Sequence, residues 1–188
     1  MKIESYLEFS APLIENIYIK KLYTERRSLH GSEDIDGFIV DCAQHFSKKV
    51  LQLSFGRGKD GILYERQWQM EFYRVATSVL PERHGISADV GKIFDADGLI
   101  DFYINGQLQW GIELLREGSN ADEHAKRFKE GGNYWPMKNT IKAYALVDCR
   151  SDIPPVLKDN FWYLVHDDGF ETITIHRKGK KSVIVKIK

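Results

Sequence analysis

The chain has 188 residues, enough for one domain or for one domain with an extra helical layer. Basic and acidic residues balance at 27 each, so net charge gives no support to a nucleic-acid partner, although it leaves room for a local basic patch. No apolar run approaches the roughly 20 residues of a membrane span, so no membrane partner is expected. The first residues are too polar for a signal peptide, and the absence of paired-cysteine motifs favours a reducing compartment.

Residues 1–61 are expected to form a helical extension packed on a core domain of residues 62–188. Short apolar groups within residues 1–30 are typical of a strand or a short helix packed against that domain. Residues 32–50 are predicted to form one amphipathic helix, because apolar side chains recur there at helical spacing after a capping sequence.

A second helix is predicted for residues 62–80, where Pro81 stops it. Glu71 falls at the edge of its apolar arc and could face the sheet that follows. Position alone favours the simpler interpretation, in which Glu71 is a solvated acid paired with Arg74. The arc itself consists of Trp68, Phe72, Val75, Ala76 and Val79.

A strand over residues 86–94 is expected to lead into a β-hairpin over residues 98–116. Asn105-Gly106 is a strong signal for a two-residue type I′ turn between strands 99–104 and 108–115. Each arm carries one carboxylate in an otherwise apolar run, Asp101 and Glu113. Two acids on adjacent strands repel each other unless a cation lies between them, so the pattern predicts a hard divalent metal.

A helix of about three turns is predicted for residues 117–132, with Ser119 and Asp122 as a capping box. His124 and Arg127 share one of its faces. Two interpretations stay open for them: ordinary surface groups, or side chains that contact a phosphate.

Further strands are predicted for residues 141–148, 161–165, 170–176 and 183–188. The basic cluster at residues 177–181 lies at the tip of the last hairpin. It could attract a polyanion, or its lysines could protect an exposed edge strand from aggregation.

The order helix, three strands, helix, strand from residue 62 to 148, with acids at Glu71, Asp101 and Glu113, resembles the PD-(D/E)xK or restriction-endonuclease-like superfamily. This resemblance implies an α/β (α+β) fold with an αβββαβ core and a mixed central sheet flanked by helices. An N-terminal helix and C-terminal strands would then be additions to that core.

Four separated blocks within residues 62–135 resemble the nuclease-like C-terminal domains of Crinkler-type effector proteins. The resemblance implies a DNA-directed domain that acts in the nucleus of a host cell. The blocks are Glu71-Phe-Tyr-Arg74, the Ile-Asp-Phe-Tyr-Ile of residues 100–104, the Trp-Gly-Ile-Glu-Leu-Leu-Arg-Glu-Gly of residues 110–118, and Glu123-His124 followed by Arg127-Phe128.

The resemblance further implies phosphodiester hydrolysis with Mg²⁺ or Mn²⁺ held by Asp101, Glu113 and Glu71, and with the phosphate contacted by His124 and Arg127. The family's lysine two residues after the second acid is replaced by Leu115, which cannot polarise water. Three alternatives follow: a nearby cation such as Lys126 or Arg127 substitutes for the lysine, the metal alone activates water, or the domain binds without cutting. Nucleic-acid contacts are expected from Arg116, Lys126, Arg177, Lys178, Lys180 and Lys181.

DNA is the expected partner, with RNA, a second copy of the chain and a host protein as further candidates. A catalytically inactive nuclease-like module that binds nucleic acid or a host protein is the main alternative to an enzyme. A purely structural interaction domain is the third hypothesis.

Overall fold

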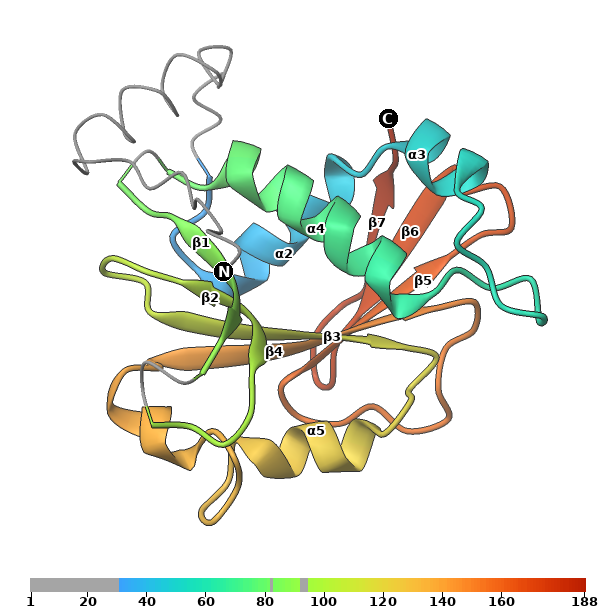
Figure 1. The fold of residues 1–188 in the computed structure, drawn as a ribbon. Helices are drawn as coiled ribbons and strands as arrows, with labels where there is room; N and C mark the ends of the chain where they lie inside the picture. The colour runs from blue at the N-terminus through green and yellow to red at the C-terminus, as the bar shows by residue number, and fades with distance from the viewer. Residues whose placement is uncertain (1–30, 82, 92–94) are drawn as a thin grey trace, which may run out of the picture.

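The computed structural model describes residues 31–81, 83–91 and 95–188. Its centre is a mixed sheet of seven strands that lie side by side in chain order. Helices α2 and α4 lie on one face of this sheet and α5 lies on the other (Figure 1). The mixed α/β architecture with flanking helices is therefore confirmed, whereas the element expected within residues 1–30 lies outside the described residues.

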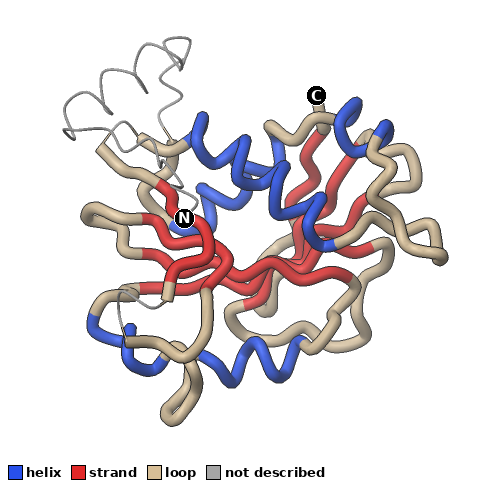
Figure 2. Tube along the Cα trace, in the orientation of Figure 1, coloured by secondary structure: helices blue, strands red, loops and turns tan. Residues whose placement is uncertain are grey.

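The strands form one continuous sheet (Figure 2). It contains two antiparallel parts joined by a parallel centre. Strands β1 to β3 form an antiparallel meander, β3, β4 and β5 run parallel, and β6 and β7 return antiparallel. The predicted strands after residue 140 are all present. The strands are β1 (Ile86–Val90), β2 (Ile100–Ile104), β3 (Trp110–Arg116), β4 (Ala143–Arg150), β5 (Phe161–His166), β6 (Thr172–His176) and β7 (Val183–Lys186).

The hairpin between β2 and β3 is present, but its predicted two-residue turn is wrong. Ile104 pairs with Trp110, so five residues separate the strands, and only Gly106 of the Asn105-Gly106 pair has a positive φ. Asn105 is instead bound to the start of β1. Its amide donates to the Gly85 carbonyl at 3.0 Å, and its side chain accepts from the Gly85 amide at 2.7 Å.

The single helix predicted for residues 32–50 is two helices, α2 (Ile35–Gln44) and α3 (Lys48–Leu53). Asp34 caps the first helix through the amides of residues 36 and 37, as the sequence signal indicates. Ser47 caps the second helix by accepting from the Val50 amide, so a new helix begins there.

Helix α4 (Glu65–Val79) buries the predicted apolar arc. Helix α5 (Ala121–Arg127) is shorter than predicted and begins after Asn120, without the expected capping box. A 3₁₀-helix, η2 (Trp135–Asn139), follows it before the chain enters β4. Helix α5 thus lies on the crossover between the parallel strands β3 and β4.

The main hydrophobic core lies between the sheet and the helices α2 and α4, and smaller clusters lie under α5 on the other face. Phe38 and Ile39 of α2 belong to the same core as Trp68 and Phe72 of α4. No helix in the described part of the chain combines the length and apolar character that crossing a membrane requires.

Candidate functional site: a buried acid pair between two helices

The predicted acid pair lies where the ladder between β2 and β3 ends. Phe102 and Ile112 form the last pair of that ladder, and Asp101 and Glu113 come one residue further. Here side chains replace backbone carbonyls as acceptors. The Asp101 amide lies 3.3 Å from Glu113 Oε1, and the Leu114 amide donates to Asp101 Oδ2 at 2.7 Å. The two carboxylates therefore take part in holding the strands together.

Glu113 is completely buried and is surrounded by donors from α5 and the segment after it. His124 Nδ1 lies 2.6 Å and Arg127 Nη1 lies 3.1 Å from Glu113 Oε2. The Tyr134 hydroxyl lies 2.7 Å from Oε1, on the oxygen that also faces the Asp101 amide. A carboxylate offers about four acceptor positions, so Glu113 has a partner for each of them.

Asp101 has fewer partners and connects to α4 on the other side. Gln69 Nε2 donates to Oδ1 at 3.1 Å, and Gln69 also lies within 3.4 Å of Glu65 Oε1. Burial, followed by the negative charge of Glu113, raises the pKa of Asp101 to about 7. Burial also raises the pKa of Glu65. The α4 side of the site therefore holds two acids whose ionised forms are disfavoured by burial.

Glu71, the third acid expected at the metal, is not brought to the pair. Arg74 donates to both of its oxygens, from Nε at 2.8 Å and from Nη2 at 2.6 Å, and the Ser47 amide donates to Oε1 at 2.5 Å. The simpler interpretation, an Arg74 partner, is confirmed, except that Glu71 is buried and not solvated. The Glu71 carboxylate joins α4 to the start of α3, so Glu71 does not belong to the candidate site.

The acid that α4 contributes to the site is Glu65, with Gln69 one turn later. Sequence reasoning missed both, although a signal was available. Glu65, Gln69, Phe72 and Ala76 recur at the spacing of one helical stripe, and two polar residues on an apolar stripe need partners. Tyr134 had no comparable signal, because it follows α5 in an irregular segment.

Leu115 occupies the position of the missing lysine and is fully buried against Leu146, Phe161 and Tyr163 under α5. Arg116 comes next and points to the α4 side, where it pairs with Asp60 in the loop before α4. As expected from strand alternation, Arg116 is on the face opposite to Leu115. The basic side chains that reach Glu113 are thus His124 and Arg127.

The remaining basic residues lie apart from the acid pair. Lys126 is exposed on α5. Arg177 pairs with Asp36, and Lys178 lies 2.8 Å from Asp159. The tip of the β6–β7 hairpin is separated from β3 by β4 and β5, about 14 Å of sheet at the usual strand spacing. The predicted nucleic-acid contacts at residues 177–181 therefore do not belong to the acid site.

Among the described residues, no group of three or more His, Cys, Asp and Glu side chains is arranged to hold a metal. Mg²⁺ does not require such a group, because one or two carboxylates with water and phosphate oxygens commonly bind it. Asp101 fits this role, since each of its oxygens accepts one hydrogen bond from the described residues and its charge is poorly balanced. Glu113 could join it only when one of its present donors moves away.

The chain was compared with protein-family models, with curated proteins and with solved structures. No family model, no curated protein and no solved structure matches it.

Proposed function

We propose that this chain is a metal-dependent nuclease domain of the PD-(D/E)xK type that hydrolyses phosphodiester bonds in DNA. The observation that carries the proposal is the partly buried Asp101 beside the fully buried Glu113, with His124 and Arg127 on the Glu113 carboxylate. The order α4, β1, β2, β3, α5, β4, with β3 and β4 parallel, is what the αβββαβ core requires and supports the same proposal.

Arg127 is suited to bind the phosphate. Its Nη1 is engaged with Glu113, while its side chain is one-third exposed, so the rest of the guanidinium can reach a ligand. A guanidinium matches phosphate oxygens with paired donors and keeps its charge at all relevant pH values. Lys126, exposed on the same helix, adds positive charge to the approach.

His124 is the group best suited to take a proton from water. When Nδ1–H donates to Glu113, the lone pair of the ring lies on Nε2, and the buried carboxylate stabilises the imidazolium that forms. The water oxygen would bond to phosphorus, its proton would pass to His124 Nε2, and the bond from phosphorus to one sugar oxygen would break. His124 thus substitutes for the lysine that Leu115 replaces.

Asp101 would hold the divalent ion, with Glu113 and Glu65 beside it. When bound, the ion supplies positive charge to the phosphate group and lowers the pKa of bound water. The raised pKa of Asp101 supports this role, because a cation beside two neighbouring acids would favour their ionised forms.

Plasmid cleavage in Mg²⁺ or Mn²⁺ tests the proposal. We expect Asp101→Asn, Glu113→Gln and His124→Gln each to lower the rate by a factor on the order of 100. Glu71→Gln is the matched control, since it removes the charge of a buried glutamate on α4 without touching the acid pair. Cleavage that survives in both Asp101→Asn and Glu113→Gln would refute the site assignment.

A second candidate function is a module that binds nucleic acid without cutting it. The burial of Leu115 at the lysine position and the four donors around Glu113 favour it. Its signature would be salt-dependent binding of DNA or RNA, with no cleavage of either under any divalent ion. The Crinkler-like role, a host nucleus, a host protein partner and a homodimer stay predictions.

A further inference from the structure

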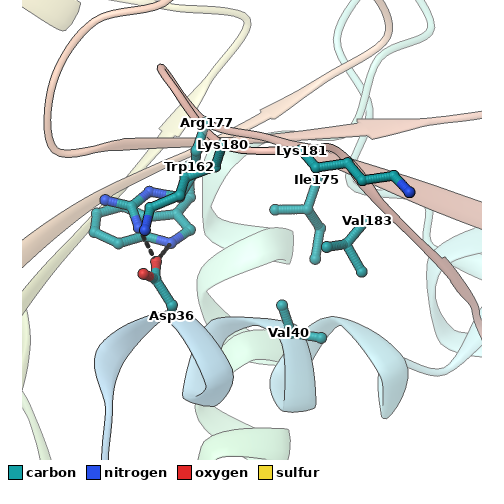
Figure 3. A pocket seen from close by; sticks show the side chains of 8 residues that line it. All are labelled: Asp36, Val40, Trp162, Ile175, Arg177, Lys180, Lys181 and Val183. Atoms are coloured by element: carbon teal, nitrogen blue, oxygen red, sulfur yellow. Dashed lines mark hydrogen bonds and ion pairs between the residues drawn. The ribbon is translucent and has the colours of Figure 1, made fainter.

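A second site lies near the β7 edge of the sheet, at the tip of the β6–β7 hairpin. A pocket of about 210 Å³ opens there between α2 and strands β5, β6 and β7 (Figure 3). Its walls are apolar, formed by the side chains of Val40, Ile175 and Val183 and by the indole of Trp162. Lys180 and Lys181 stand at its rim.

The charge of this site is positive, because its one acid is already neutralised. Asp36 pairs with Arg177 and accepts a hydrogen bond from Trp162 Nε1 at 2.8 Å. No ion pair with a described residue engages Lys180 or Lys181, and both are exposed. A ligand that fits the pocket would therefore combine an apolar group with negative charge.

The pocket reaches the edge of the sheet. Strand β7 pairs with β6 and has no other strand partner among the described residues, so one row of its backbone N–H and C=O groups faces outward. Val183, which lines the pocket, is 41% exposed, and Ile184 is 70% exposed. An extended segment that adds to an exposed edge gains backbone hydrogen bonds and places alternate side chains on one face.

The size of the pocket fits one side chain better than a whole small molecule. Its volume of about 210 Å³ is below the roughly 300–1,000 Å³ of typical ligand pockets. A nucleic acid is also a poor fit, since Trp162 is buried with the guanidinium of Arg177 4.0 Å from its ring centroid. No exposed aromatic face lines the pocket on which a base could stack.

We propose that β7 accepts an extended acidic segment of a partner protein as an added strand. One large apolar side chain of that segment would enter the pocket, and flanking carboxylates would pair with Lys180 and Lys181. This proposal is independent of nuclease activity, because it uses neither the acid pair nor a metal.

Fluorescence anisotropy with the full chain tests it. The probe is a short fluorescein-labelled peptide in which glutamate alternates with leucine, and we expect saturable binding. The same peptide with proline at its centre should bind on the order of tenfold more weakly, because proline removes a backbone donor and cannot continue a strand. A single-stranded DNA of equal charge should compete poorly.

Variants of the chain separate the pocket from general electrostatics. Lys181→Glu should weaken peptide binding on the order of tenfold, whereas Lys178→Glu, the same change on the same hairpin but outside the pocket, should change it less than twofold. Val40→Phe, confirmed as folded by its melting curve, should block the anchor side chain. Equal weakening by Lys178→Glu and Lys181→Glu, equal binding of the proline peptide, or tighter binding of the DNA would each overturn the proposal.

Discussion

Two buried glutamates, Glu71 and Glu113, show how differently one fold can treat the same side chain. Glu71 on α4 is held by Arg74 and by a backbone amide, with no other acid among its hydrogen-bond partners. Glu113 on β3 has a histidine, an arginine and a tyrosine around it, and a second acid, Asp101, next to it. Glu71 forms a structural ion pair with Arg74. Glu113 belongs to a cluster that contains a second acid, Asp101.

Burial of an acid therefore does not by itself indicate a functional site. A buried acid with one arginine partner joins elements of structure, as Glu71 does between α4 and α3. The pair at Asp101 and Glu113 is distinguished by two acids side by side, and burial together with the negative charge of Glu113 raises the pKa of Asp101 to about 7. Substitutions in the Glu71–Arg74 pair and in the cluster around Glu113 should therefore have different effects.

The largest expected effect is that of removing Glu113. In Glu113→Ala, His124, Arg127 and the buried hydroxyl of Tyr134 lose their common acceptor, so we expect a loss of about 3 kcal/mol in the free energy of unfolding. Glu71→Ala should lose only about 1–2 kcal/mol, because Arg74 is half exposed and returns to water. Urea denaturation of both variants measures the two losses in the free energy of unfolding. Equal losses would contradict the proposed difference between Glu71 and Glu113.

A smaller effect, of opposite sign, is expected at Asp101. Its pKa is raised in the folded state, so the folded chain keeps a proton that the unfolded chain has released, and stability falls as the pH rises from about 4 to 7. Asp101→Asn removes this loss and should stabilise the chain by about 2 kcal/mol at pH 8, with little change near pH 4. Melting temperatures at both pH values measure the difference.

The control for that experiment is Asp97→Asn, which changes an exposed acid in the preceding turn and should leave the pH dependence unchanged. A variant at Asp101 that is less stable than the wild type at pH 8 would mean that the two acids are not in conflict. Glu113 would then be a structural carboxylate like Glu71, which would contradict the proposed site.

The smallest expected effect comes from Tyr134→Phe. The hydroxyl lies 2.7 Å from Glu113 Oε1 and 2.7 Å from the Leu99 carbonyl, and its loss should cost about 1 kcal/mol in unfolding free energy. Tyr144→Phe is the matched control, since the Tyr144 hydroxyl accepts a hydrogen bond from Asn160 at the surface. Its removal should change the free energy of unfolding by no more than ~0.5 kcal/mol. Calorimetry that finds no difference between the two would remove Tyr134 from the cluster.

Much of the sheet and the acid pair could be predicted from local patterns. Two apolar runs on either side of Asn105-Gly106 placed Asp101 and Glu113 on adjacent antiparallel strands, and this adjacency follows from the hairpin whatever its turn. The turn itself could not be predicted, because Asn105 binds Gly85, which is distant in sequence. The break between α2 and α3 was missed because apolar spacing continues across the Ser47 cap.

The choice of the wrong acid on α4 has a geometric reason. Gln69 and Glu71 lie about 200° apart around the helix, so they flank opposite sides of the same apolar face. Periodicity identifies both flanks but does not say which one meets the hairpin, since this depends on how the helix crosses the sheet. The structure places Gln69 beside Asp101 and turns Glu71 toward Ser47.

At the end of the β2–β3 ladder, two backbone amides depend on the carboxylates of Asp101 and Glu113 for their hydrogen bonds. A rotation that takes either carboxylate away breaks the hydrogen bond of the amide of residue 101 or residue 114. Deuterium uptake at these two positions should therefore slow when a cation binds Asp101 and accelerate when the carboxylate rotates away. This exchange rate would report occupancy of the site without any catalytic turnover.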